Sequence, residues 1–172
     1  CFFARGSAWN DVMTVGESAS GPDCDVRVAT RFFPVSAALA PYCSIIYLTE
    51  VDGPPGARIE DYLHPEWANL RFIDGEPSLA AVGGGKAEPM PSFVVTGPTS
   101  KATYFSVGPM RAWGIGFLPA GWAKFFAVPA EDLADRSIDG AQHPAFAAHA
   151  SLLQQLRQAN DIEGAAKMLD EH

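Results

Sequence analysis

The sequence predicts an α+β protein whose strands come first and whose helices come last. Between residues 28 and 118, short runs of β-branched and aromatic residues are separated by Gly and Pro clusters such as DGPPG and GPTS. After residue 118, apolar residues recur at the spacing of amphipathic helices. This segregated order favours a β-barrel or sandwich with helices added, rather than a wound α/β sheet.

The change of pattern along the chain predicts three parts. Residues 1–27 have little periodicity and are predicted to form an N-terminal arm or lead-in; residues 28–118 form the β-barrel; residues 119–172 form a helical segment that packs on the barrel. The chain begins with Cys1 instead of Met, so we expect it to be part of a longer protein.

Composition and charge exclude several classes of partner. The 172 residues are 48% hydrophobic and 19% charged, with a formal net charge of -8. An acidic surface without a local Lys and Arg cluster repels phosphates, so this chain is not expected to bind nucleic acid itself. No apolar run is long enough to span a bilayer. The three cysteines are far apart, which favours reduced thiols in the cytoplasm.

Residues 67–75, WANLRFIDG, alternate as a strand with two different faces. One face carries Trp67, Asn69, Arg71 and Ile73, and the other carries Ala68, Leu70 and Phe72. The following Asp74-Gly75 pair predicts a hairpin turn before the strand PSLAAV.

An aromatic ring, an amide and a guanidinium on one strand face predict a small-molecule pocket. The candidate ligand-binding residues are Trp67, Asn69 and Arg71, joined by Tyr104 and Trp113 from later strands. The alternative is that the tryptophans pack in the core while Arg71 reaches solvent or pairs with an acid.

The glycine-rich stretches do not match phosphate-binding loops. In GIGFLPAGW, Pro119 occupies the place of the third glycine of a dinucleotide fingerprint, and VGGGKAEP lacks the Ser or Thr of a P-loop. Gly114 and Gly116 lie on one face of a strand, where an aromatic ring or a ligand could pack against them.

The sequence gives no positive indication of catalysis. Of the four histidines only His64 falls in the β region, so a metal site of the cupin type is not expected. There is no G-x-S-x-G elbow and no nucleophile with a clear base. We expect no catalytic residues, no metal and no cofactor.

Two amphipathic stretches follow the barrel. Apolar residues form one stripe over residues 144–159 and another over residues 162–169, and Asn160 is predicted to cap the second helix. The stripes are candidates for a dimer interface or, equally, for packing on the barrel. The interface candidates are Leu152, Leu156, Ala159, Ile162 and Leu169.

Several stretches resemble the amino-terminal half of an AraC-type transcriptional regulator. They are RFFPVSAALAPYCSIIYLTEV, HPEWANLRFIDG, the run from VTGPTSK to RSIDG, and the helical tail. The most specific part is GIGFLPAGW followed by FFAVPAEDLAD. The resemblance extends roughly from Val28 to His172 and is closest to a subgroup with a cupin-like sensor module.

The resemblance implies a cupin-like β-barrel or jelly roll followed by two to four C-terminal helices. It also implies a function: an effector-sensing and dimerisation domain of a bacterial regulator, with an unknown small-molecule effector and a homodimeric state. DNA would be bound only through a C-terminal helix-turn-helix domain that this chain lacks. The alternative is a small metal-free cupin-like enzyme or small-molecule-binding protein.

Overall fold

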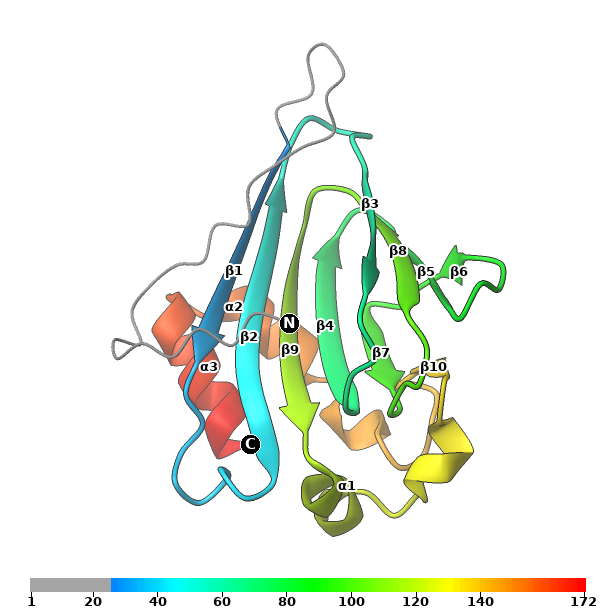
Figure 1. Cartoon of the computed structure of the whole chain (residues 1–172). Coiled ribbons are helices and arrows are strands. Elements are labelled where there is room, and N and C mark those ends of the chain that lie inside the picture. Colours follow the sequence, from blue (N-terminus) through cyan, green and yellow to red (C-terminus); the bar gives the residue numbers. More distant parts are fainter. Residues whose placement is uncertain (1–25) are drawn as a thin grey trace, which may run out of the picture.

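The computed structural model describes residues 26–172, which form two antiparallel β-sheets and a mainly C-terminal set of helices (Figure 1). The predicted α+β class is therefore confirmed. The predicted arm lies almost wholly outside the described residues, and Arg27 already begins the first strand.

The larger sheet has six strands. In spatial order they are β1 (Arg27–Phe33), β2 (Cys43–Asp52), β9 (Met110–Phe117), β4 (Asn69–Gly75), β7 (Phe93–Thr96) and β10 (Ser137–Asp139). The second sheet has four, in the order β3 (Ile59–Leu63), β8 (Thr103–Val107), β5 (Leu79–Val82) and β6 (Glu88–Pro89). Within residues 26–172 no strand of one sheet pairs with a strand of the other, so the sheets are not closed into a barrel.

The helical segment contains three α-helices and two short 3₁₀ turns. The α-helices are α1 (Pro119–Phe125), α2 (Leu152–Gln158) and α3 (Ile162–Glu171), and the 3₁₀ turns are Ala130–Leu133 and Ala147–His149. This segment also contributes β10 to the larger sheet, where it pairs with β7. A three-residue strand is too short to show a periodicity of two, which is why the sequence did not predict it.

The cap of α3 is one residue later than predicted. Asp161, in an extended conformation, accepts a hydrogen bond of 2.6 Å from the backbone N–H of Gly164. A carboxylate at this position also interacts favourably with the positive end of the helix dipole. The prediction that Asn160 caps the helix was therefore wrong.

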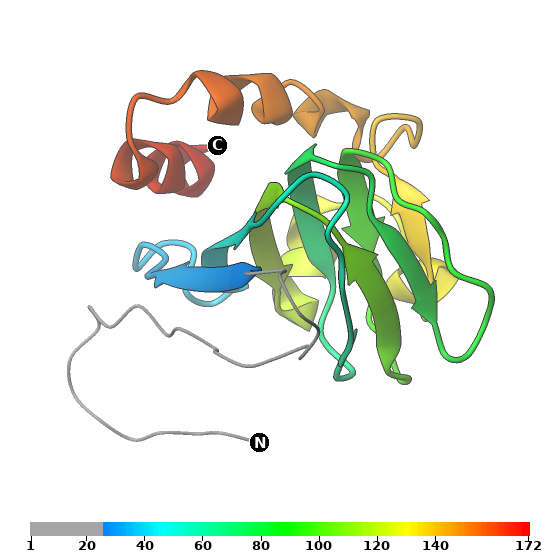
Figure 2. The same cartoon turned by 90° about the horizontal axis from the view of Figure 1, so that it is seen from above.

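The hydrophobic core lies between the six-stranded sheet and the helices. Figure 2 shows α2 and α3 along one side of that sheet, with the four-stranded sheet on the other side. Leu70 and Phe72 of β4 belong to one buried cluster with Leu152 and Leu156 of α2. The rings of Phe72 and Phe93 stack with centroids 4.6 Å apart.

The predicted hairpin after Asp74-Gly75 is wrong. β4 pairs with β9 and β7, whereas the next strand, β5, belongs to the other sheet and pairs with β8 and β6. Gly75 has a φ of 137°, and a Cβ there would meet the backbone of Met110 at 2.6 Å. The glycine therefore allows β4 to end against β9 rather than to turn a hairpin.

Two further observations concern the helices and Cys43. Among residues 26–172, the helices are all too short and too polar to cross a membrane. Cys43 is a free, buried thiol, and burial raises its pKa to about 11.

Candidate functional site

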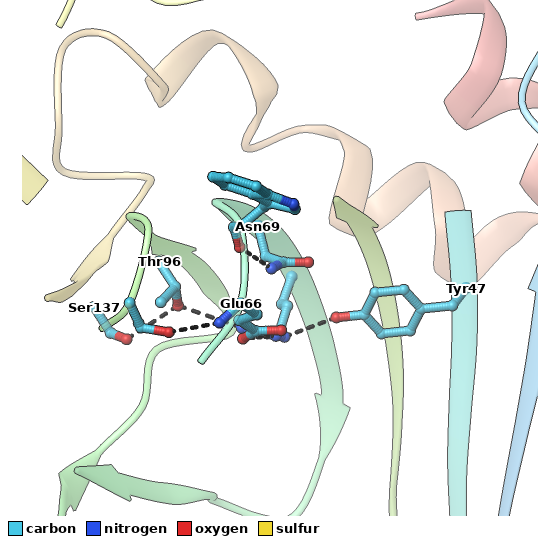
Figure 3. A network of polar contacts seen from close by, with 8 residues as sticks. Tyr47, Glu66, Asn69, Thr96 and Ser137 are labelled. Carbon is cyan, nitrogen blue, oxygen red and sulfur yellow. Dashed lines mark hydrogen bonds and ion pairs between the residues drawn. The ribbon is translucent and has the colours of Figure 1, made fainter. Parts of the chain in front are cut away.

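Arg71, in the middle of β4, is the centre of a polar network (Figure 3). Its Nε donates to the hydroxyl of Tyr47 at 2.8 Å, and its Nη2 donates to the carboxylate of Glu66. A longer contact of 3.4 Å joins Nη1 to Oγ1 of Thr96. The side chain of Arg71 is only 17% exposed, so a full charge lies largely inside the protein with three polar partners.

Arg71 and Tyr47 face away from α2 and α3. Along β4, Arg71 alternates with Leu70 and Phe72, which both belong to the core under the helices. Tyr47 alternates in the same way with Ile46 and Leu48 on β2. Since successive side chains of a strand point to opposite faces, the network lies on the face that the four-stranded sheet covers.

Glu66 reaches Arg71 from the loop between β3 and β4. The backbone of this residue is fixed by Thr99, whose Oγ1 accepts from the Glu66 N–H at 2.9 Å and whose N–H donates to the Glu66 carbonyl at 3.0 Å. The side chain of Glu66 is 26% exposed. The loop thus holds the backbone of Glu66 in place while its side chain stays in contact with solvent.

A chain of hydroxyl groups leads from Arg71 to a pocket. Oγ1 of Thr96 lies 3.0 Å from Oγ of Ser137, the first residue of β10. Ser137 lines a pocket of about 210 Å³ between β10 and the β5–β6 hairpin. Its other lining residues are Ala80, Ala81, Val82, Lys86, Glu88, Met90, Asp135 and Arg136. The network therefore extends to an opening between the edges of the two sheets.

The environment keeps Arg71 charged and Tyr47 neutral. Burial works against the guanidinium, but Tyr47 and Glu66 outweigh it and hold the pKa of Arg71 above its ordinary value. Burial raises the pKa of Tyr47 above its ordinary value of 10.0, an effect that the neighbouring Arg71 charge opposes and Glu66 reinforces. Tyr47 is therefore a neutral hydrogen-bonding group near neutral pH and is poorly suited to act as a base.

Tyr47 gives a pH-dependent test of the network. Replacing Tyr47 with Phe should lower the free energy of unfolding near neutral pH by about 0.5–1.5 kcal/mol, because one hydrogen bond to Arg71 is lost. Since the folded pKa lies above the unfolded value of 10.0, the wild type also loses stability as the pH rises above 10.0 and through the folded pKa. The variant lacks this loss, so the stability difference between the two proteins should shrink in urea titrations at alkaline pH. A constant difference would contradict the raised pKa.

The structure brings two of the predicted ligand-binding residues, Asn69 and Arg71, together on the same face of β4. The side chain of Asn69 donates to the backbone carbonyl of Trp67 at 2.6 Å. The Trp67 side chain precedes the strand and is 56% exposed. Its ring therefore lies at the surface beside the network, not within it.

The other two predicted ligand-binding residues lie elsewhere. Trp113 is 4% exposed and lies opposite Phe72 in the β4–β9 pairing, so it belongs to the core on the helix side. There it also lines a smaller pocket of about 110 Å³. Tyr104 lies on β8 of the second sheet, with its ring centroid 5.6 Å from that of Tyr62.

The candidate dimer-interface residues lie on the helical tail, mostly facing the sheet of their own chain. Leu152, Leu156 and Leu169 are buried in the core, while Ala159 and Ile162 are partly buried against it. Packing on the β-region is the alternative that the sequence left open, and the structure shows it for the three leucines. Dimerisation itself stays a prediction.

Sequence reasoning missed Tyr47, Glu66, Thr96 and Ser137. One signal pointed to Tyr47: Gly114 was expected to face an aromatic ring or a ligand, and a Cβ at Gly114 would overlap with the Tyr47 ring. The aromatic alternative is thus confirmed for Gly114. At Gly116 the nearest atom would be the hydroxyl of Ser44, at 2.5 Å. Glu66 lies in a loop without periodicity, so no sequence pattern connected it with Arg71.

Neither a metal site in the described residues nor a known family is identified for this chain. Within residues 26–172, no group of three or more His, Cys, Asp and Glu side chains is arranged to hold a metal ion. Compared with known families and curated proteins, the sequence matches no family model and no curated protein.

Proposed function

We propose that this chain is the effector-sensing and dimerisation domain of a bacterial AraC-type transcription regulator in the cytoplasm. A small molecule binds between the two sheets, which correspond to a cupin-like jelly roll, and DNA is bound by a C-terminal helix-turn-helix domain outside this chain. The observation that carries the sensing role is the nearly buried Arg71 with its polar partners.

Burying this polar network on one face of the sheet costs free energy. Burying charged groups costs free energy unless they are paired, and an apolar interior of similar volume is often at least as stable. The opposite face of the same sheet has such an apolar interior, formed by Leu70, Phe72 and their neighbours. A few convergent polar groups on one face only are the feature that fixes the orientation of a small ligand in a binding site.

The position of the network on β4 provides a route to the helices. Arg71 lies on one face of this strand, and Leu70 and Phe72 on the other face share the core with α2. The end of β4 is also joined to α2, because Arg157 donates to Asp74 at 2.7 Å. A ligand that binds Arg71 and shifts β4 would therefore change the packing of the tail, whose partly buried residues Ala159 and Ile162 are candidates for the dimer contact.

A screen of small polar molecules by thermal shift tests this proposal. We expect stabilising compounds to act on the wild type and on an Arg111→Met control, but not on Arg71→Met. Arg111 lies on the same sheet with its side chain half exposed and pairs with Glu50, so the control removes one positive charge away from the network. Light scattering on the wild type, with and without the compound, measures the molar mass and so shows whether the protein is a dimer.

Three outcomes would contradict parts of the proposal. A compound that stabilises Arg71→Met as well as the wild type would place the binding site elsewhere. A monomer with and without ligand would remove the dimerisation role. Conversion of a bound compound into a product would favour the small metal-free enzyme.

A further inference from the structure

The contact between Arg71 and Glu66 is incomplete for a guanidinium and a carboxylate. Such pairs commonly form two parallel hydrogen bonds, but here only Nη2 and Oε1 are in contact. A guanidinium has five N–H donors, of which Arg71 uses three on Tyr47, Thr96 and Glu66. Donors of Arg71 thus remain without a partner among residues 26–172.

Glu66 can leave Arg71 without a rearrangement of the backbone. The two hydrogen bonds with Thr99 involve only the backbone of Glu66, so rotation about the side-chain bonds leaves them intact. The side chain of Glu66 is already partly exposed, and its carboxylate would gain hydration outside the network. Arg71 has no such freedom, because Tyr47 and Thr96 hold it from two strands.

We propose that Glu66 is an internal competitor, which occupies Arg71 until a small molecule bearing a carboxylate displaces it. This inference rests on the proposed sensing function and names its ligand class. The group that Arg71 binds in the structure is itself a carboxylate, so an external carboxylate would make the same contact and could use the spare donors for a second one. The rest of the molecule would extend toward solvent, because the side chain of Glu66, whose place the external carboxylate would take, is 26% exposed.

Competition by Glu66 has a consequence for the affinity of the ligand. When Glu66 holds Arg71, ligand binding must first break an internal ion pair, so the apparent affinity is reduced by the fraction of molecules in which Arg71 is free. Removing Glu66 should therefore tighten the binding of carboxylates. A purely structural ion pair predicts only a loss of stability from the same change.

The test is chemical rescue of Glu66→Ala with acetate. We expect acetate to raise the melting temperature of this variant and to bind it about tenfold more tightly than the wild type, because the guanidinium is free. Acetamide at equal concentration, in buffers matched for ionic strength, should have no such effect. The double variant Glu66→Ala, Arg71→Met should not respond to acetate.

Glu50→Ala is the matched control, since Glu50 is a half-buried carboxylate on the same sheet that pairs with Arg31 and Arg111. Equal acetate rescue of this variant, or none of Glu66→Ala, would overturn the inference. If Glu66→Ala fails to fold, Glu66→Gln keeps the size of the side chain and should still bind acetate more tightly than the wild type.

The same samples separate this inference from the proposed function. Failure of acetate together with Arg71-dependent binding of a neutral compound would overturn the role of Glu66 and leave the sensing function standing. Inorganic phosphate that binds Glu66→Ala more tightly than acetate would overturn the carboxylate assignment. Absence of binding by acetate and by every compound in the screen would contradict both.

Discussion

Replacing Leu152 with Asp should lower the free energy of unfolding by about 4 kcal/mol or more, or prevent folding altogether. Leu152 is 1% exposed and lies in the core between α2 and the six-stranded sheet. A carboxylate at this position would be buried without a cation to pair with, and the core would also lose the contacts of the leucine side chain. Urea denaturation followed by circular dichroism measures the effect.

Gln155→Asp is the control, because it introduces the same residue at an exposed position of the same helix. We expect it to change the stability by about 0.5 kcal/mol or less. A Leu152→Asp variant that is as stable as the wild type but monomeric, from a dimeric parent, would contradict the buried position. That result would place Leu152 in the dimer interface that the sequence suggested.

Gly121→Ala is the second change with a large expected effect. A Cβ at Gly121 would overlap with the carbonyl oxygen of Tyr42, and backbone cannot move aside as the end of a flexible side chain can. The same carbonyl accepts a hydrogen bond of 2.8 Å from Leu118, directly before α1. We expect a loss of about 1–3 kcal/mol, which exceeds the gain of about 0.5–1 kcal/mol that alanine normally brings inside a helix.

Gly85→Ala is the matched substitution for this experiment. The nearest atom to a Cβ at Gly85 is 3.9 Å away, so the same change meets no obstacle there. Thermal or urea unfolding of both variants should show a clear loss only for Gly121→Ala. Equal stability of the two variants would mean that α1 does not pack on Tyr42 as closely as the structure shows.

Local patterns in the sequence predict much of the fold but not the partners of each strand. Alternation along residues 67–75 correctly separated Leu70 and Phe72 from Asn69 and Arg71. A strand that packs only one face on an apolar core has apolar residues at every second position. The hairpin after Asp74 was wrong because pairing of β4 with β9 and β7 depends on residues far away in the chain. The local sequence pattern does not predict such long-range pairings.

The candidate site was predicted only in part, because it too depends on the pairing of strands that are far apart in the sequence. Arg71 was found because it shares one face of the strand with Trp67 and Asn69, whereas Trp113 was assigned to the wrong side. The register of β4 and β9 determines which side chains lie on the same face of the sheet. In this register Arg71 lies opposite Gly114, and Phe72 lies opposite Trp113. Glu66 comes from a loop, and its role depends on a contact that no periodicity predicts.

Nuclear magnetic resonance of the Arg71 side chain would test the central claim most directly. The Nε–H group of Arg71 donates to the hydroxyl of Tyr47 and is next to the donors that a carboxylate would occupy. When acetate is added to Glu66→Ala, the Arg71 Nε–H signal should shift and saturate, while that of Arg111 should stay unchanged. An unchanged Arg71 signal in the folded protein, at acetate concentrations that saturate the thermal shift, would contradict binding at this network.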